Sequence, residues 1–75
     1  MKKSILVPYD FTEVGNYALE HAYMVGKASR TPISIIHIVK KTSEIEEAKA
    51  KLEKIAKDFA SQKDIEVVAE VRKGN

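Results

Sequence analysis

Two short apolar runs flank a segment long enough for one helix, and this arrangement restricts the fold more than any other feature. Residues 4–8 (SILVP) and 33–39 (ISIIHIV) are apolar on both faces of an extended chain. Strands buried on both faces are typical of parallel sheets, whose neighbouring strands are joined by crossovers of about a dozen residues or more. The sequence therefore predicts an α/β fold with a parallel sheet.

The segment between the two runs has the periodicity of a helix. Val14, Ala18, Ala22 and Val25 recur at steps of three and four residues, which places them on one face. Thr12 precedes this pattern and is a suitable N-cap. We expect the helix to cover residues 13–29 and to end before Pro32, because a proline disfavours helical geometry in the residue before it.

A second helix and a third strand follow. Ser43 and Glu46 have the spacing of a capping box, and an apolar stripe then continues through Ile45, Ala48, Leu52, Ile55, Ala56 and Phe59. After this helix, apolar residues alternate with Glu66, Val68 and Glu70, at Ile65, Val67, Ala69 and Val71. This alternation predicts a half-buried strand at the edge of the sheet.

The element order is therefore β-α-β-α-β, a three-stranded parallel sheet for which we expect the spatial order 3-2-1. Crossovers between parallel strands are nearly always right-handed, so both helices should cover the same face. The other face would then expose Leu6, Ile36, Ile38 and Val68. So much apolar surface indicates that something covers it.

Composition excludes several functional classes. The 75 residues suffice for one small core, and no apolar segment is long enough to cross a membrane or resembles a signal peptide. We therefore expect no membrane partner and a cytoplasmic location. The absence of cysteine and the two separated histidines predict no metal site. A net charge of +2 does not indicate nucleic-acid binding, although Lys40-Lys41 and Arg72-Lys73 form small basic patches.

The residues also carry a family resemblance. The segment KSILVPYDFTEVGNYALEHAYMV, the later strand ISIIHIV and the amphipathic helix after it resemble the amino-terminal half of the universal stress protein family. The resemblance implies part of a doubly wound, Rossmann-like domain of the adenine nucleotide alpha hydrolase type. Many family members bind ATP or another adenine nucleotide. Residues 1–75 are expected to form a single partial domain without the family's C-terminal strands and glycine-rich phosphate loop.

The candidate nucleotide-binding residues are Pro8, Tyr9, Asp10, Thr12 and Ile38. Ligands of open α/β sheets lie beyond the carboxyl ends of the strands, and Asp10 follows such an end. Its carboxylate can accept hydrogen bonds from a ribose hydroxyl or a base amine. The alternative is that Asp10 complements the dipole of the helix that follows, by about 0.3–1 kcal/mol. The resemblance implies that Pro8, Asp10 and Ile38 take part in a nucleotide pocket.

The other candidates have simpler structural explanations. Thr12 has the geometry to reach a phosphate, but an N-cap role is favoured. We predict that Tyr17 and Tyr23 cover the core and that His37 is a core histidine whose hydrogen bonds are satisfied. No nucleophile, base and oxyanion donors occur together, so we expect no catalytic residues, and the sequence does not indicate an enzyme.

Two functional classes remain. One is a stress-response or regulatory protein that holds part of an ATP pocket, and the other is a protein–protein interaction module that binds no nucleotide. Because Gly15, Gly26 and Gly74 are too scattered to surround phosphates, we expect residues 1–75 to bind a nucleotide weakly or not at all.

The first strand would have one unpaired edge in the order 3-2-1, although its Ile5, Leu6 and Val7 are typical of a central strand. An exposed apolar edge favours pairing with another chain. We therefore predict a homodimer or higher assembly in which first strands pair antiparallel.

Overall fold

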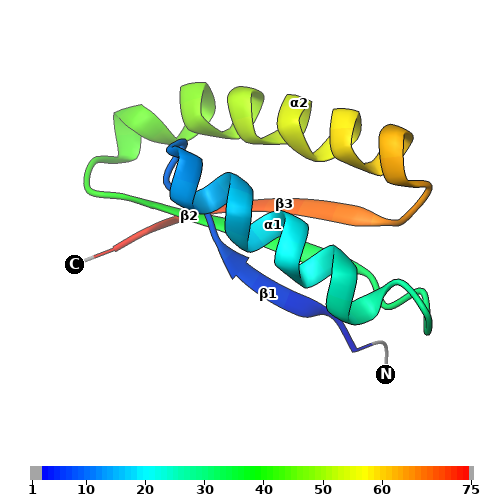
Figure 1. Ribbon diagram of the computed structural model, residues 1–75. Coiled ribbons are helices and arrows are strands. Elements are labelled where there is room, and N and C mark those ends of the chain that lie inside the picture. The colour runs from blue at the N-terminus through cyan, green and yellow to red at the C-terminus, as the bar shows by residue number, and fades with distance from the viewer. Residues whose placement is uncertain (1–2, 75) are drawn as a thin grey trace.

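The computed structural model describes residues 3–74 as one three-stranded sheet with two helices on it. The elements, in chain order, are β1 (Ile5–Pro8), α1 (Glu13–Gly26), β2 (Ile33–Val39), the short 3-10 helix η1 (Thr42–Glu44), α2 (Ile45–Lys63) and β3 (Val67–Lys73). All strands are parallel, with β2 between β1 and β3. Both helices lie over the same face (Figure 1). The predicted α/β class, element order and strand order are confirmed.

The core lies between this face and the helices. Ile33 and Ile35 of β2 and Leu52 of α2 are fully buried, and each contributes about 1.5–3 kcal/mol through burial. The two helices meet through Tyr23 and Phe59, whose ring centroids are 6.0 Å apart in an edge-on arrangement. The predicted core position of Tyr23 is thus confirmed, whereas that of Tyr17 is wrong, because the Tyr17 side chain is exposed on the side of α1 away from the sheet. Residues 33–39 form β2 with the predicted bounds, and its Ile33, Ile35 and Val39 are buried on the face covered by the helices.

The opposite face of the sheet carries no element in the part of the chain that the structure describes. Leu6, Ile38 and Val68 are exposed there, and Ile36 is half-buried. Polar groups lie among them, since Ser34 donates to Ser4 and Glu70 pairs with Arg72. The predicted bare face is confirmed, but it is a mixture of apolar and polar residues.

Helix α1 differs from its prediction at its end and on its face. It ends at Gly26, and Thr31 N–H then donates to the Gly26 carbonyl at 3.1 Å while Arg30 takes a left-handed conformation (φ 54°). The segment up to residue 29 is therefore a tight turn, not helix. The side of α1 predicted to face the core included Val14 and Val25, but both side chains are exposed. The side that faces the sheet is instead formed by Gly15, Leu19, Ala22 and Gly26.

Helix α2 begins in a different way from the predicted capping box. The Glu44 carboxylate accepts a hydrogen bond from Lys41 N–H at 3.0 Å, and η1 leads directly into the helix. The predicted Ser43–Glu46 capping box is therefore wrong, because the corresponding hydrogen bond joins Lys41 and Glu44, two residues earlier in the chain. At the other end, Asp64 ends α2 in a left-handed conformation (φ 53°), and Arg30 donates to its carbonyl at 3.1 Å.

Within residues 3–74, neither helix has the length and apolar character required to cross a membrane.

Candidate functional site

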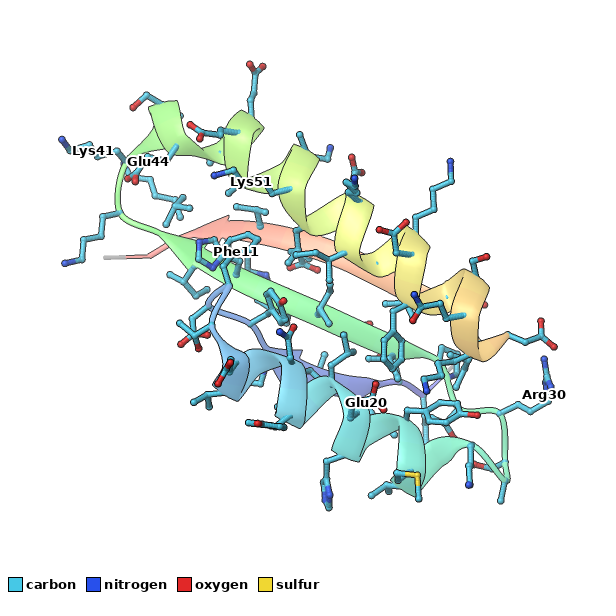
Figure 2. All side chains as sticks on the ribbon, turned by 45° about the horizontal axis from the view of Figure 1, so that its top comes forward. Phe11, Glu20, Arg30, Lys41, Glu44 and Lys51 are labelled. Carbon is cyan, nitrogen blue, oxygen red and sulfur yellow. The ribbon has the colours of Figure 1, made fainter. Side chains whose placement is uncertain are left out.

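The loop between β1 and α1 forms the carboxyl-end site and is held by an aromatic cluster. Tyr9 N–H donates to the Ile36 carbonyl at 2.8 Å, which extends the pairing of β1 by one residue. Phe11 then reverses the chain in a left-handed conformation (φ 63°). Its ring packs edge-on against Tyr9 and His37, with centroid distances of 5.4 and 4.6 Å. Figure 2 shows Phe11 towards the end of the molecule that carries Lys41 and Glu44.

His37 ties this loop to the second strand. Its Nδ1 lies 2.8 Å from the Tyr9 carbonyl oxygen, so Nδ1 carries the proton and donates. The ring is partly buried beneath Phe11. His37 is half-buried and does not belong to the predicted core, but the predicted hydrogen bond is present and fixes the loop on β2.

Asp10 projects from the same loop and is bound by Thr12. The Thr12 hydroxyl donates to Oδ1 of Asp10 at 2.5 Å, and Thr12 N–H donates to the same oxygen at 3.1 Å. These two hydrogen bonds, the hydroxyl first, lower the pKa of the Asp10 carboxyl, and His37 lowers it further by charge. Asp10 is therefore ionised at neutral pH, and its Oδ2 receives neither Thr12 bond.

Thr12 occupies the N-cap of α1, as predicted, but its side chain makes no capping hydrogen bond. The hydroxyl donates to the Asp10 carboxylate instead, because a hydrogen bond to a charged acceptor is stronger than a hydrogen bond between a neutral amide and a hydroxyl. The expected side-chain cap is therefore wrong. A phosphate-binding role for Thr12 remains a prediction.

Tyr9 is a core residue that forms one wall of the site. Its ring is buried, and its hydroxyl donates to Oδ1 of Asn16 at 2.5 Å. Burial, followed by the Asp10 charge, raises the pKa of Tyr9. The ring lies against Gly15, where an added Cβ would be only 2.9 Å from Tyr9 Cδ1. This contact explains a glycine in the first turn of a helix, where it costs about 0.5–1 kcal/mol relative to alanine.

A cavity of about 450 Å³ opens beside this loop, at the carboxyl ends of β1 and β2. Its walls are largely apolar and comprise Pro8, Tyr9, Asp10, Val14, Gly15, Ala18, Ile36, His37 and Ile38. Four of the five sequence candidates thus line one cavity: Pro8, Tyr9, Asp10 and Ile38. Thr12 is not part of the wall and contacts it through Asp10. The volume and the apolar lining with one ionised group are typical of a small-molecule site.

The sequence reasoning did not identify the part of this wall that α1 and β2 supply. Val14, Gly15 and Ala18 come from the first turns of α1, and Ile36 lies opposite Pro8 in the sheet register. Gly15 carried the one usable signal, because a glycine inside a helical pattern indicates a close approach of another group. No group of three or more His, Cys, Asp or Glu residues that suits a metal occurs within residues 3–74.

Comparison with known proteins identifies the family. Residues 1–75 match the family model described as "Universal stress protein family". This chain belongs to the universal stress protein family. The resemblance inferred from the sequence is therefore confirmed. A search of curated proteins found no significant match.

A solved structure supports the same assignment. The crystal structure of a universal stress protein from Archaeoglobus fulgidus DSM 4304 superposes with a TM-score of 0.77 at 28% sequence identity. The match covers 96% of the present universal stress protein chain and 25% of the archaeal chain. The chain thus spans a quarter of the length of that relative, and the common part contains both helices and the parallel sheet.

Proposed function

We propose that this universal stress protein chain binds an adenine nucleotide, with the nucleoside in the cavity at the carboxyl ends of β1 and β2. The observation that supports this proposal is the position of Asp10, an ionised carboxylate at the wall of an apolar cavity of about 450 Å³. Family membership supports it as well, since ATP binding is expected of many universal stress proteins. The proposal concerns binding, and no catalytic residue is assigned.

Asp10 and the apolar walls would divide recognition between them. Oδ1 of Asp10 already accepts two hydrogen bonds from Thr12, so Oδ2 is the oxygen suited to a ribose hydroxyl or the adenine amino group. Ile38 and Val14 are exposed at the cavity and offer apolar contact to a purine. Because like charges repel, the phosphates would extend away from Asp10.

The affinity should depend little on the number of phosphates. The three glycines of the chain are separated, so the sequence contains no glycine-rich loop whose N–H groups could surround a phosphate. Most of the binding free energy would come from the nucleoside. We expect ATP, ADP and AMP to bind with similar dissociation constants of about 1 mM, which corresponds to about 4 kcal/mol.

Isothermal titration calorimetry of the three nucleotides tests this function. Asp10→Ala should weaken all three by about tenfold or more, because a charge-assisted hydrogen bond contributes about 1.5–3 kcal/mol. Asp58→Ala is the matched control, since Asp58 is an exposed carboxylate on α2, away from the cavity. Equal affinities of the wild type and Asp10→Ala would exclude Asp10 from the site. A much tighter binding of ATP than of AMP would contradict the nucleoside mode.

The second candidate is a protein–protein interaction module of the same family that binds no nucleotide. It is favoured by the exposed apolar residues of the bare face and of α1, which include Leu6, Ile38, Val68 and Val14. Absence of nucleotide binding by the wild type would support this alternative. The cytoplasmic location inferred from the sequence remains a prediction under either function.

A further inference from the structure

Asp10 lies between two residues that both contact His37. On one side of Asp10 in the chain, the Tyr9 carbonyl oxygen is 2.8 Å from His37 Nδ1. On the other side, the Phe11 ring packs edge-on against the His37 ring, with the centroids 4.6 Å apart. One side chain of β2 therefore holds both chain neighbours of the carboxylate that is proposed to meet the nucleoside.

The hydrogen bond from His37 extends the attachment of this loop to β2 beyond the end of β1. Tyr9 N–H donates to the Ile36 carbonyl, and in a parallel pair the next donor to the Tyr9 carbonyl would be an N–H group of β2. Here the His37 ring donates to that carbonyl. Because a side chain supplies this bond, the backbone can leave the strand direction at Asp10 and remain attached to the sheet.

The ring contact holds the residue after Asp10. Phe11 has a left-handed backbone conformation (φ 63°), which is unfavourable for a residue with a side chain. Its edge-on contacts with Tyr9 and His37 offset this cost. If the contacts of His37 were lost, the Phe11 backbone would relax, and Asp10 would move with it.

The His37 ring is also part of the wall of the site. Both His37 and Asp10 line the cavity of about 450 Å³. His37 lines a second cavity as well, of about 210 Å³, whose other walls include Phe11 and Glu44. The ring thus lies between the proposed nucleoside site and the start of α2, where a displacement of the ring would alter the position of the loop.

We propose that His37 is a positioning residue of the nucleoside site and acts on the ligand through Asp10. This inference rests on the proposed function, because that function assigns the polar contact to Asp10. A carboxylate that is already held in place loses less conformational freedom when the ligand binds, and this raises the affinity. Loss of the Nδ1 hydrogen bond should weaken AMP binding by about threefold to tenfold, the effect expected of one hydrogen bond.

NMR titrations with AMP test the role of this hydrogen bond. His37→Phe keeps a ring against Phe11 but has no donor for the Tyr9 carbonyl, so its affinity should fall by about threefold to tenfold. His37→Asn places an amide N–H near the position of Nδ1 and should bind AMP within about twofold of the wild type. His21→Phe is the matched control, because His21 does not line the cavity. Wild-type affinity in His37→Phe, or an equal loss in His37→Asn, would overturn the proposal.

A double-mutant cycle distinguishes positioning from a general loss of structure. If His37 acts through Asp10, adding His37→Phe to Asp10→Ala should change the AMP affinity by less than about twofold. The full loss in the Asp10→Ala background would show that His37 acts independently of Asp10 and would overturn the proposal.

Amide hydrogen exchange tests the positioning without a ligand. Thr12 N–H donates to Oδ1 of Asp10, and its exchange in His37→Phe should accelerate by about threefold or more relative to Ile35 N–H. Ile35 is fully buried in β2, so its amide reports global unfolding. Unchanged relative exchange at Thr12 would overturn the role of His37. If the wild type bound no AMP, the proposed function would fail, and exchange at Thr12 would still decide whether His37 holds Asp10.

Discussion

Asp10 and Thr12 are joined by two hydrogen bonds that end on the same carboxylate oxygen, Oδ1. This turn fixes the direction of the carboxylate and leaves its second oxygen without a hydrogen bond to Thr12. The same two hydrogen bonds lower the pKa of the Asp10 carboxyl. The loop geometry and the electrostatics of the site therefore depend on one short contact.

Replacement of Thr12 by valine should raise the pKa of Asp10 towards its ordinary value. The hydroxyl of Thr12 is the largest cause of the lowered pKa, and valine keeps the shape of threonine without the donor. Thr12→Ser should keep the pKa low. Titration of the Asp10 carboxyl by NMR measures both variants, and an unchanged pKa in Thr12→Val would contradict this explanation.

The same shift has a consequence for stability in acid. A carboxyl whose folded pKa is lowered stabilises the fold above its unfolded pKa of about 3.9, and this stabilisation is lost as the pH falls through the folded pKa. Thr12→Val should therefore reduce the pH dependence of the unfolding free energy below about pH 4. Urea unfolding at several acid pH values measures the slope. A slope identical to that of the wild type would count against the linkage.

Gly15→Ala should destabilise the protein although alanine favours helices. An added Cβ would be 2.9 Å from Tyr9 Cδ1 and 3.3 Å from Oδ1 of Asp10. Overpacking of this kind costs about 1–3 kcal/mol, against about 1 kcal/mol gained in helix propensity. We expect a net loss of up to about 2 kcal/mol by thermal or urea unfolding. A more stable variant would show that Tyr9 moves aside easily.

Much of the fold was predictable because the pattern of apolar residues in the sequence shows which segments must be buried. Residues 33–39 are apolar on both faces, and they form β2 with the predicted bounds. The end of α1 was not predictable in the same way, because Arg30, not a glycine, takes the left-handed conformation after it. The exposure of Val14 and Val25 was missed for a related reason. Periodicity locates an apolar stripe, but it does not say which of two stripes meets the sheet.

The only residues of the candidate site that the sequence predicted are those at or just after the end of a strand. Asp10 and Pro8 come directly from the end of β1, and Ile38 from the matching end of β2. The contact of Thr12 with Asp10 had a local signal that the sequence reasoning did not use, because aspartate often accepts a hydrogen bond from the backbone N–H two residues on. The contribution of Val14 and Ala18 depends on how α1 crosses the sheet, which is a tertiary property.

Phe11 combines a strained backbone with favourable ring contacts, and two substitutions separate these effects. Both Phe11→Ala and Phe11→Gly remove the edge-on contacts with Tyr9 and His37. Only glycine relieves the left-handed conformation at φ 63°. Phe11→Gly should therefore be more stable than Phe11→Ala by about 1 kcal/mol. Equal stabilities in urea unfolding would indicate that the loop relaxes once the ring is removed.

Leu52→Ala tests the core between α2 and the sheet. Leu52 is fully buried, and a truncation of this kind costs about 2–5 kcal/mol. Small domains have about 5–15 kcal/mol in total, so a large share of the stability would be lost. Lys57→Ala, at an exposed position of α2, should change stability by less than about 0.5 kcal/mol. Similar effects of the two substitutions would contradict the described packing of α2.

The nucleoside site itself is tested most directly by an NMR titration of the wild-type chain with AMP. If the cavity binds the nucleoside, the backbone amides of Asp10, Gly15 and Ile38 should shift together along one saturable curve. The amides of Arg30 and Asp64, at the opposite end of the molecule (Figure 2), should stay in place. The absence of saturable shifts at millimolar AMP, or shifts concentrated away from Asp10, would contradict the proposed function.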